Sequence, residues 1–84
     1  MEYHLYILKL SNGRYYTGIT YNVDKRFREH QEGFVVSTKG FLPVELKFSQ
    51  SFESQKIARK YEVKVKSWSQ TKKEKLIIGE WILN

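Results

Sequence analysis

The sequence contains no cysteine, which excludes a disulfide-stabilised scaffold, a thiol nucleophile and a zinc site built on thiolates. Only two histidines are present, His4 and His30, so a four-ligand zinc site would also need several carboxylates. Long apolar runs are absent, and residues 1–4 show neither the basic nor the apolar region of a signal peptide. We therefore expect no membrane segment, no secretion signal and a cytoplasmic location.

What is present is enough for one small domain. The chain has 84 residues, of which 40% are hydrophobic and 15% aromatic, and this composition is too apolar for a disordered tail. The length leaves no room for a second hydrophobic core, and no repeat or linker divides the chain. We expect a single domain over residues 1–84 and a monomer.

Positive charge is concentrated in one segment. The net charge is +6, and residues 56–75 account for all of it, because acidic and basic residues balance elsewhere. Such a field attracts polyanions through counterion release, although a solvated, lysine-rich helix face would have the same composition. The residues that we expect to bind nucleic acid are Lys56, Arg59, Lys60, Lys64, Lys66, Lys72 and Lys73.

Three strands are predicted. Residues 3–10 and 14–20 are rich in strand formers, and the turn signal Ser11-Asn12-Gly13 between them predicts a β-hairpin. Residues 44–50 alternate apolar and polar side chains, as in a half-buried strand, and the apolar members are Val44, Leu46 and Phe48.

Helices are predicted at 22–32, 55–68 and 71–80. Asn22 and Ser54 are suited to begin the first two, and Gly33 to end the first. The apolar stripe of the second comprises Ile57, Ala58, Tyr61, Val65 and Trp68. In the third helix we expect Leu76, Ile77 and Ile78 to point inward, and in the tail we expect residues 81–84 to pack on the core. The order β-β-α-β-α-α predicts an α+β domain with a three-stranded sheet covered by helices.

The register of the hairpin decides which tyrosines meet. A three-residue loop pairs Leu8 with Tyr16 and places Tyr6 and Tyr16 on one face, beside Gly18, whose missing side chain leaves room for an approaching group. A two-residue Asn12-Gly13 loop places the two tyrosines on opposite faces instead. Asn-Gly fits both loops, so the turn alone does not choose.

Two helical positions carry further polar groups. Arg26 and His30 are four residues apart and share one helix face with apolar neighbours. Glu62 lies among basic residues at the edge of an apolar stripe, where the local pattern favours an ordinary ion pair with Lys66. Together with the tyrosines, these residue types suit phosphodiester hydrolysis. That reaction needs an arginine fork for the phosphoryl group, a carboxylate for a hard metal ion and a proton acceptor for water.

The chain resembles the GIY-YIG nuclease superfamily. His4-Leu5-Tyr6 stands at the first motif and Tyr16-Thr17-Gly18 at the second, followed by Arg26, His30 and Glu62 in the right order. The strings at 17–20, 25–33 and 58–66 look most like the small stand-alone bacterial members, most of which are uncharacterised. The sequence departs from the family pattern at His4, at Thr17 and in having no asparagine between residues 70 and 80.

The resemblance implies an endonuclease that depends on Mg²⁺ or Mn²⁺ and cuts DNA, including branched or repair intermediates. Tyr16 would help to activate water, Arg26 would stabilise the transition state and Glu62 would hold the metal ion. Tyr6 and His30 would support the site, and the resemblance favours the register that puts both tyrosines on one face. The alternative is a nucleic-acid-binding module with weak or no catalysis that depends on a protein partner for targeting. A small interaction protein with no nucleic-acid role is a third reading.

Overall fold

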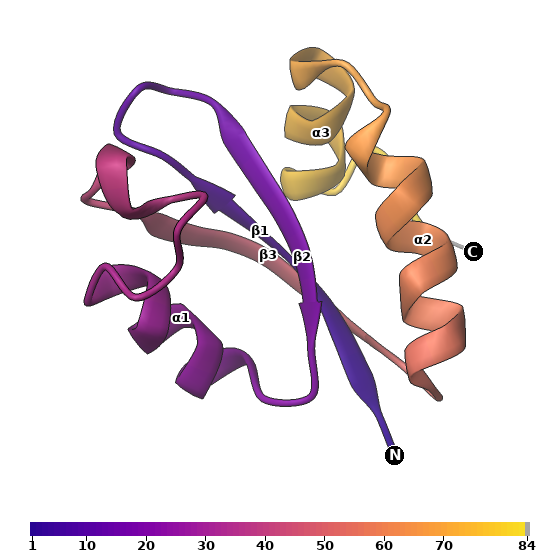
Figure 1. Ribbon diagram of the computed structural model, residues 1–84. Helices are drawn as coiled ribbons and strands as arrows, with labels where there is room; N and C mark the ends of the chain where they lie inside the picture. The colour runs from indigo at the N-terminus through magenta and orange to yellow at the C-terminus, as the bar shows by residue number, and fades with distance from the viewer. Residues whose placement is uncertain (84) are drawn as a thin grey trace.

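The sheet and the helices follow the predicted order. The computed structural model describes residues 1–83 and has the order β-β-α-β-α-α, which confirms the α+β class (Figure 1). One antiparallel sheet has the strand order β2-β1-β3 and comprises β1 (Tyr3–Lys9), β2 (Tyr15–Thr20) and β3 (Glu45–Phe52).

Helices cover both faces of this sheet. One face packs against α1 (Val23–Gln31) and the short 3-10 helix η1 (Lys39–Phe41), and the other packs against α2 (Gln55–Lys66) and α3 (Gln70–Ile77), as Figure 1 shows. Strand β2 therefore forms one edge of the sheet, between α1 on one side and α2 on the other.

The hairpin has the three-residue loop. Leu8 pairs with Tyr16 and Tyr6 with Gly18, and the backbone N–H of Leu10 donates to the carbonyl of Arg14 over 2.8 Å. Gly13 completes the turn at a φ of +85°, a conformation that glycine adopts without steric cost. Tyr6 and Tyr16 consequently share the face that α1 covers, which confirms the register favoured by the family resemblance.

A β-bulge in β3 changes which residues that strand buries. Ile7 pairs with Phe48 while its neighbour Leu8 pairs with Leu46, so Lys47 is an extra residue. The bulge turns Leu46 toward the α1 face and Phe48 toward the α2 face. The simple alternation expected from the sequence, with both residues on one face, is therefore wrong.

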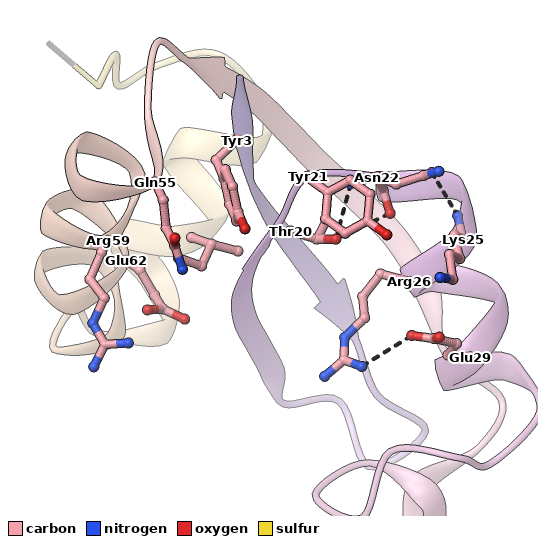
Figure 2. Close-up of a pocket in the computed structure, with 11 residues that line it drawn as sticks. Tyr3, Thr20, Tyr21, Asn22, Lys25, Arg26, Glu29, Gln55, Arg59 and Glu62 are labelled. Atoms are coloured by element: carbon pink, nitrogen blue, oxygen red, sulfur yellow. Dashed lines mark hydrogen bonds and ion pairs between the residues drawn. The ribbon is translucent and has the colours of Figure 1, made fainter. Parts of the chain in front are cut away.

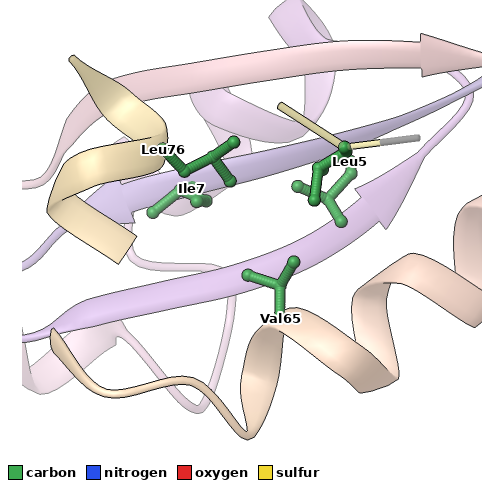
Figure 3. Packing of buried hydrophobic residues seen from close by; sticks show 5 residues of the cluster. Leu5, Ile7, Val65 and Leu76 are labelled. Atoms are coloured by element: carbon green, nitrogen blue, oxygen red, sulfur yellow. The ribbon is translucent and has the colours of Figure 1, made fainter. Parts of the chain in front are cut away.

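Each face of the sheet has its own apolar cluster. Against α2 and α3, the strand residues Leu5 and Ile7 pack on Val65 and Leu76 (Figure 3). Against α1, the cluster comprises Tyr6, Leu8, Val44, Leu10, Tyr16, Phe27 and Leu46. Because β1 is the central strand, its alternating side chains supply both clusters.

The helix caps follow the predictions for the first two helices. Asn22 and Ser54 accept hydrogen bonds from the backbone of Lys25 and Ile57 respectively. The third helix differs from expectation: Ser69 caps it, so it begins at Gln70.

The third helix also ends earlier than expected. It stops at Ile77 because Gly79 takes a φ of +89° two residues later. Leu76 is buried, but Ile78 is 68% exposed, so its predicted inward position is wrong. Ile57, in the first turn of α2, is 37% exposed and so only partly covered.

In the tail, Leu83 is buried in the α2 cluster as expected, Trp81 and Ile82 are exposed, and Asn84 lies outside the described residues. Among the helices formed by residues 1–83, none has the length and apolar character needed to cross a bilayer.

Candidate active site

A pocket of about 380 Å³ opens at the edge of β2. Helix α1 contributes Arg26 and Glu29, and helix α2 contributes Arg59 and Glu62. Figure 2 shows the guanidinium of Arg26 and the carboxylate of Glu62 both directed into the space between the two helices. The fold thus brings together two of the sequence-predicted site residues from opposite sides of the sheet.

Arg26 is half-buried and held by a neighbour on its own helix. Its Nη1 donates to Oε1 of Glu29 over 3.1 Å (Figure 2). Burial acts to lower the pKa of Arg26, but hydrogen bonding with Tyr6 and Glu29 outweighs it and raises the pKa. The pocket therefore contains a permanently charged planar fork, which is the geometry that suits a phosphoryl group.

Glu62 is almost buried although it carries charge. Glu62 is 8% exposed, and its Oε2 lies 3.4 Å from Nζ of Lys66. Lys66 is the i,i+4 partner favoured by the local sequence pattern. The ion pair with Lys66 does not exclude a role for Glu62 in the pocket, because the same carboxylate forms part of the pocket lining. A nearly buried carboxylate is costly unless cations accompany it, and Arg59 lies in the same lining.

The other predicted site residues form a cluster on the α1 face, outside the lining of this pocket. The Tyr6 hydroxyl lies 2.9 Å from Nε2 of His30, and Nδ1 of the same ring lies 2.8 Å from Oγ1 of Thr38. Tyr16 completes the cluster, with its ring centroid 5.1 Å from that of His30 and 6.2 Å from that of Tyr6. Tyr6, Tyr16 and His30 are thus in mutual contact, and Arg26 is close enough to affect the pKa of Tyr6.

His30 is neutral at physiological pH. It is 0% exposed, and burial, together with the charge of Arg26, lowers its pKa from 6.5 to about 4. The hydroxyls of Tyr6 and Thr38 and both nitrogens of His30 all have partners when Tyr6 donates to Nε2, Nδ1 donates to Thr38, and Thr38 donates to the carbonyl of Val35. The buried imidazole is therefore held in one orientation and one tautomer.

Tyr6 retains its proton in this environment. Burial raises its pKa to about 12, against the opposing effect of Arg26. Its ring also fills the space beside Gly18, because a Cβ at position 18 would lie 2.6 Å from the Tyr6 hydroxyl oxygen. The room expected there for an approaching group is thus occupied by Tyr6, which corrects that expectation.

The predicted basic residues do not all face the pocket. Arg59 lines it, Lys66 pairs with Glu62, and Lys73 lines a smaller pocket beside the hairpin. The ammonium of Lys72 instead lies over the rings of Trp68 and Trp81, 4.3 and 4.8 Å from their centroids. The remaining residues are exposed on α2, and they are Lys56, Lys60 and Lys64.

Sequence reasoning missed two residues of this region. Thr38 lies between the predicted helix at 22–32 and the predicted strand at 44–50, and nothing in its spacing indicates that the chain folds back onto His30. Glu29 follows Arg26 by three residues, a spacing that predicts a helical ion pair and so gave a usable signal.

The residues present fit a hard divalent cation. Within residues 1–83, no cluster of three or more His, Asp or Glu side chains is arranged to hold a metal ion. Mg²⁺, however, keeps several waters and is commonly held by only one or two carboxylates. Glu62 supplies such a carboxylate, whereas Glu29, the other carboxylate of the lining, is engaged in its ion pair with Arg26.

Comparison with known proteins decides the family. Residues 2–75 match the model of the GIY-YIG catalytic domain. The chain belongs to the GIY-YIG family. This family contains nucleases that are generally metal-dependent, and both GIY-YIG tyrosine motifs of this chain lie on the hairpin described above.

The relatives of this GIY-YIG chain are similarly small. A UPF0213 protein of Halobacterium salinarum is 39% identical over 75 residues, which cover 88% of this chain and 97% of the relative. A UPF0213 protein of Natronomonas pharaonis is 38% identical over 80 residues, which cover 94% of each chain. The solution NMR structure of a UPF0213 protein from Bacillus halodurans has 37% identity and a TM-score of 0.60, covering 92% of this chain and 83% of that one. The resemblance to small stand-alone members is confirmed.

Proposed function

We propose that the protein is an endonuclease that hydrolyses phosphodiester bonds in DNA with the help of Mg²⁺ or Mn²⁺. The observation that carries the proposal is the shared pocket, where a charged arginine fork and a nearly buried carboxylate meet although their elements cover opposite faces of the sheet. A fork of this kind binds phosphate oxygens in pairs, and a lone carboxylate suits a hydrated divalent ion.

Each residue has a role that its environment supports. Arg26 binds the scissile phosphoryl group and stabilises the negative charge that develops on it. Tyr16 accepts a proton from the attacking water. Tyr6 keeps its own proton, since its pKa is about 12, and with His30 it orients Tyr16 and Arg26 through the contacts described above.

Glu62 would hold the metal ion. A bound Mg²⁺ or Mn²⁺ would supply Lewis-acid stabilisation of charge on the phosphate oxygens. Without the metal ion, the same carboxylate is paired with Lys66 across 3.4 Å, and an incoming cation would compete with that ammonium group.

The substrate is proposed to be DNA, including branched or repair intermediates, and the location the cytoplasm. Lysine and arginine residues of 56–75 would contact the backbone, since phosphate contacts supply most sequence-independent affinity. No specificity for a base is proposed, and a protein partner would provide targeting. The alternative, a binding module without catalysis, shares the same contacts and differs only in whether the backbone is cut.

The test is cleavage of labelled linear, nicked, flapped and four-way DNA with Mg²⁺ or Mn²⁺. We expect cleavage of at least one substrate, abolished by chelation, and a loss of about 100-fold or more in Glu62→Gln, because a neutral amide is a far weaker ligand. Arg26→Lys should lose about 10-fold or more while binding persists, because lysine keeps the charge without the planar fork.

The matched control is Glu53→Gln, which changes a carboxylate that precedes α2 and lines a different pocket, and this variant should cleave as the wild type does. Cleavage that survives Glu62→Gln unchanged would reject the assigned metal ligand. DNA binding without cleavage of any substrate under either metal would favour the binding-module alternative.

A further inference from the structure

A second, smaller pocket lies at the other end of β2. It has a volume of about 200 Å³, and its lining consists of Arg14, Tyr15, Gln70 and Lys73. Arg14 immediately precedes β2 and Tyr15 begins it, while Gln70 and Lys73 belong to the first turn of α3, so the pocket joins the hairpin to the carboxyl-terminal helix.

The walls of this pocket are fixed in place. Nε2 of Gln70 donates to the carbonyl of Gly13 over 3.1 Å, which ties the hairpin turn to α3. On the other side of the turn, the backbone N–H of Ser11 donates to the carbonyl of Phe41 over 2.9 Å. The two cations of the pocket are therefore carried by a turn and a helix that are held together.

The pocket carries positive charge that is not neutralised locally. Within residues 1–83, neither Arg14 nor Lys73 forms an ion pair. Burial, and then the charge of Lys66, lower the pKa of Lys73, as expected where like charges gather. One carboxylate lies beside the pocket: Glu74 accepts a long 3.5 Å hydrogen bond from the hydroxyl of Tyr15.

The charge of Lys66 acts on both pockets. Lys66 contacts Glu62 of the first pocket, and its charge also acts on Lys73 of the second. Strand β2 runs between them, with Ile19 and Thr20 at the first pocket and Tyr15 at the second. A strand of this length spans about 17–20 Å, which corresponds to about five nucleotides at the rise of about 3.4 Å per nucleotide in duplex DNA.

We infer that the pocket formed by Arg14, Tyr15, Gln70 and Lys73 is a second phosphate subsite, which holds the nucleic-acid backbone about five nucleotides from the Arg26–Glu62 pocket. The inference rests on the proposed function, because it extends the path of the same substrate along β2. The ligand class is a phosphodiester group, bound by the arginine fork and the ammonium together.

The experiment measures DNA binding without any divalent metal. Fluorescence anisotropy of a short labelled duplex in a chelating buffer gives the dissociation constant over a series of salt concentrations. We expect Arg14→Gln and Lys73→Gln each to weaken binding about 3- to 10-fold and to make the log–log salt slope shallower by about one, the signature of one lost phosphate contact. Glu74→Gln should tighten binding about 2-fold or more, since it removes the opposing carboxylate.

The matched control is Lys47→Gln. Lys47 is a cation of β3, at the opposite edge of the sheet, where it pairs with Glu45 over 2.9 Å. This variant has the same net charge as the other two, so it separates a local contact from a general loss of charge. If Arg14→Gln and Lys73→Gln bind DNA no more weakly than Lys47→Gln, the second subsite does not exist.

Failure of this inference is distinguishable from failure of the proposed hydrolysis. Cleavage that depends on Glu62, combined with Arg14 and Lys73 variants that behave as Lys47→Gln does, would remove the subsite and leave the nuclease. Weakened binding in those variants without cleavage by the wild type would keep the subsite and remove the nuclease. Titration of the wild type with inorganic phosphate, followed by amide shifts, should move the signals of Tyr15, Gln70 and Lys73 and leave that of Lys47 in place.

Discussion

The Tyr6 hydroxyl lies 2.9 Å from Nε2 of His30, at the start of a buried polar chain that continues through Thr38 to the carbonyl of Val35. This chain crosses from the central strand through α1 to the segment before η1. It fixes the aromatic cluster beside Arg26, and removal of any link leaves a buried polar atom without a partner, at a cost of about 1–3 kcal/mol.

Thr38→Val is the most direct test of that chain. Valine has nearly the shape of threonine but no hydroxyl, so Nδ1 of His30 loses its partner, and we expect the free energy of unfolding to fall by about 1–3 kcal/mol. Nitrogen-15 NMR of the imidazole should show a mixture of tautomers where the wild type shows one. Thr38→Ser keeps the hydroxyl and should restore the single tautomer; identical spectra for all three proteins would contradict the assigned chain.

The stability of the protein should depend on pH through His30. Its pKa is about 4 in the folded state against 6.5 in an unconstrained chain, so the unfolded state binds more protons between these values. Stability is therefore fully present above about pH 6.5 and decreases as the pH falls toward 4, by on the order of 3 kcal/mol in total. Urea unfolding at several pH values across this window measures the slope. His30→Gln should show a clearly smaller slope, and an equal slope would assign the effect to other groups.

Gly18→Ala should destabilise the protein by crowding the buried side chain of Tyr6. The new Cβ would lie 2.6 Å from the hydroxyl oxygen of Tyr6 and 2.8 Å from its Cζ, and the ring is only 1% exposed. We expect a loss of about 1–3 kcal/mol in denaturant unfolding. Gly40→Ala is the control, because nothing lies within 4 Å of its Cβ position, and it should change stability by less than about 0.5 kcal/mol. Equal unfolding midpoints for both variants would show that Tyr6 can move aside.

Truncation of two aliphatic side chains in or just after α3 should lower the stability of the protein by very different amounts. Leu76 is 2% exposed and packs on the strand residues Leu5 and Ile7, so Leu76→Ala should cost about 2–5 kcal/mol (Figure 3). Ile78 is largely exposed, and Ile78→Ala should cost less than about 0.5 kcal/mol. Thermal unfolding of both variants provides the comparison; a large effect at Ile78 would mean that the end of α3 packs inward after all.

The hairpin and the helix starts were predictable because their signals are local. Asn12-Gly13 specifies a tight turn, and Asn22 and Ser54 each cap a helix through their own side chains. The choice of register was not local, since Asn-Gly fits two loop lengths. The structure has the three-residue loop, whose turn is held from both sides by Phe41 and Gln70, far along the chain.

The features that sequence reasoning missed depend on tertiary contacts. The bulge at Lys47 changes the face to which Leu46 points, yet the alternating pattern reads the same with or without it. Thr38 meets His30 only because the chain after α1 folds back, and no spacing rule encodes that return. Of the candidate site, the positions of Arg26, His30 and Glu62 on helices were predictable, whereas the division between a charged pocket and a buried aromatic cluster was not.

Arg26 and Glu62 belong to helices that cover opposite faces of the sheet. Helix α1 is anchored to one apolar cluster and helix α2 to the other, and the sheet lies between them. The width of the opening is therefore set by the thickness of a β-sheet and the twist of its edge strand. We therefore expect the site to select ligands by width, because a ligand must reach from Arg26 to Glu62 across the edge of β2. Binding of such a ligand should change the backbone conformation very little.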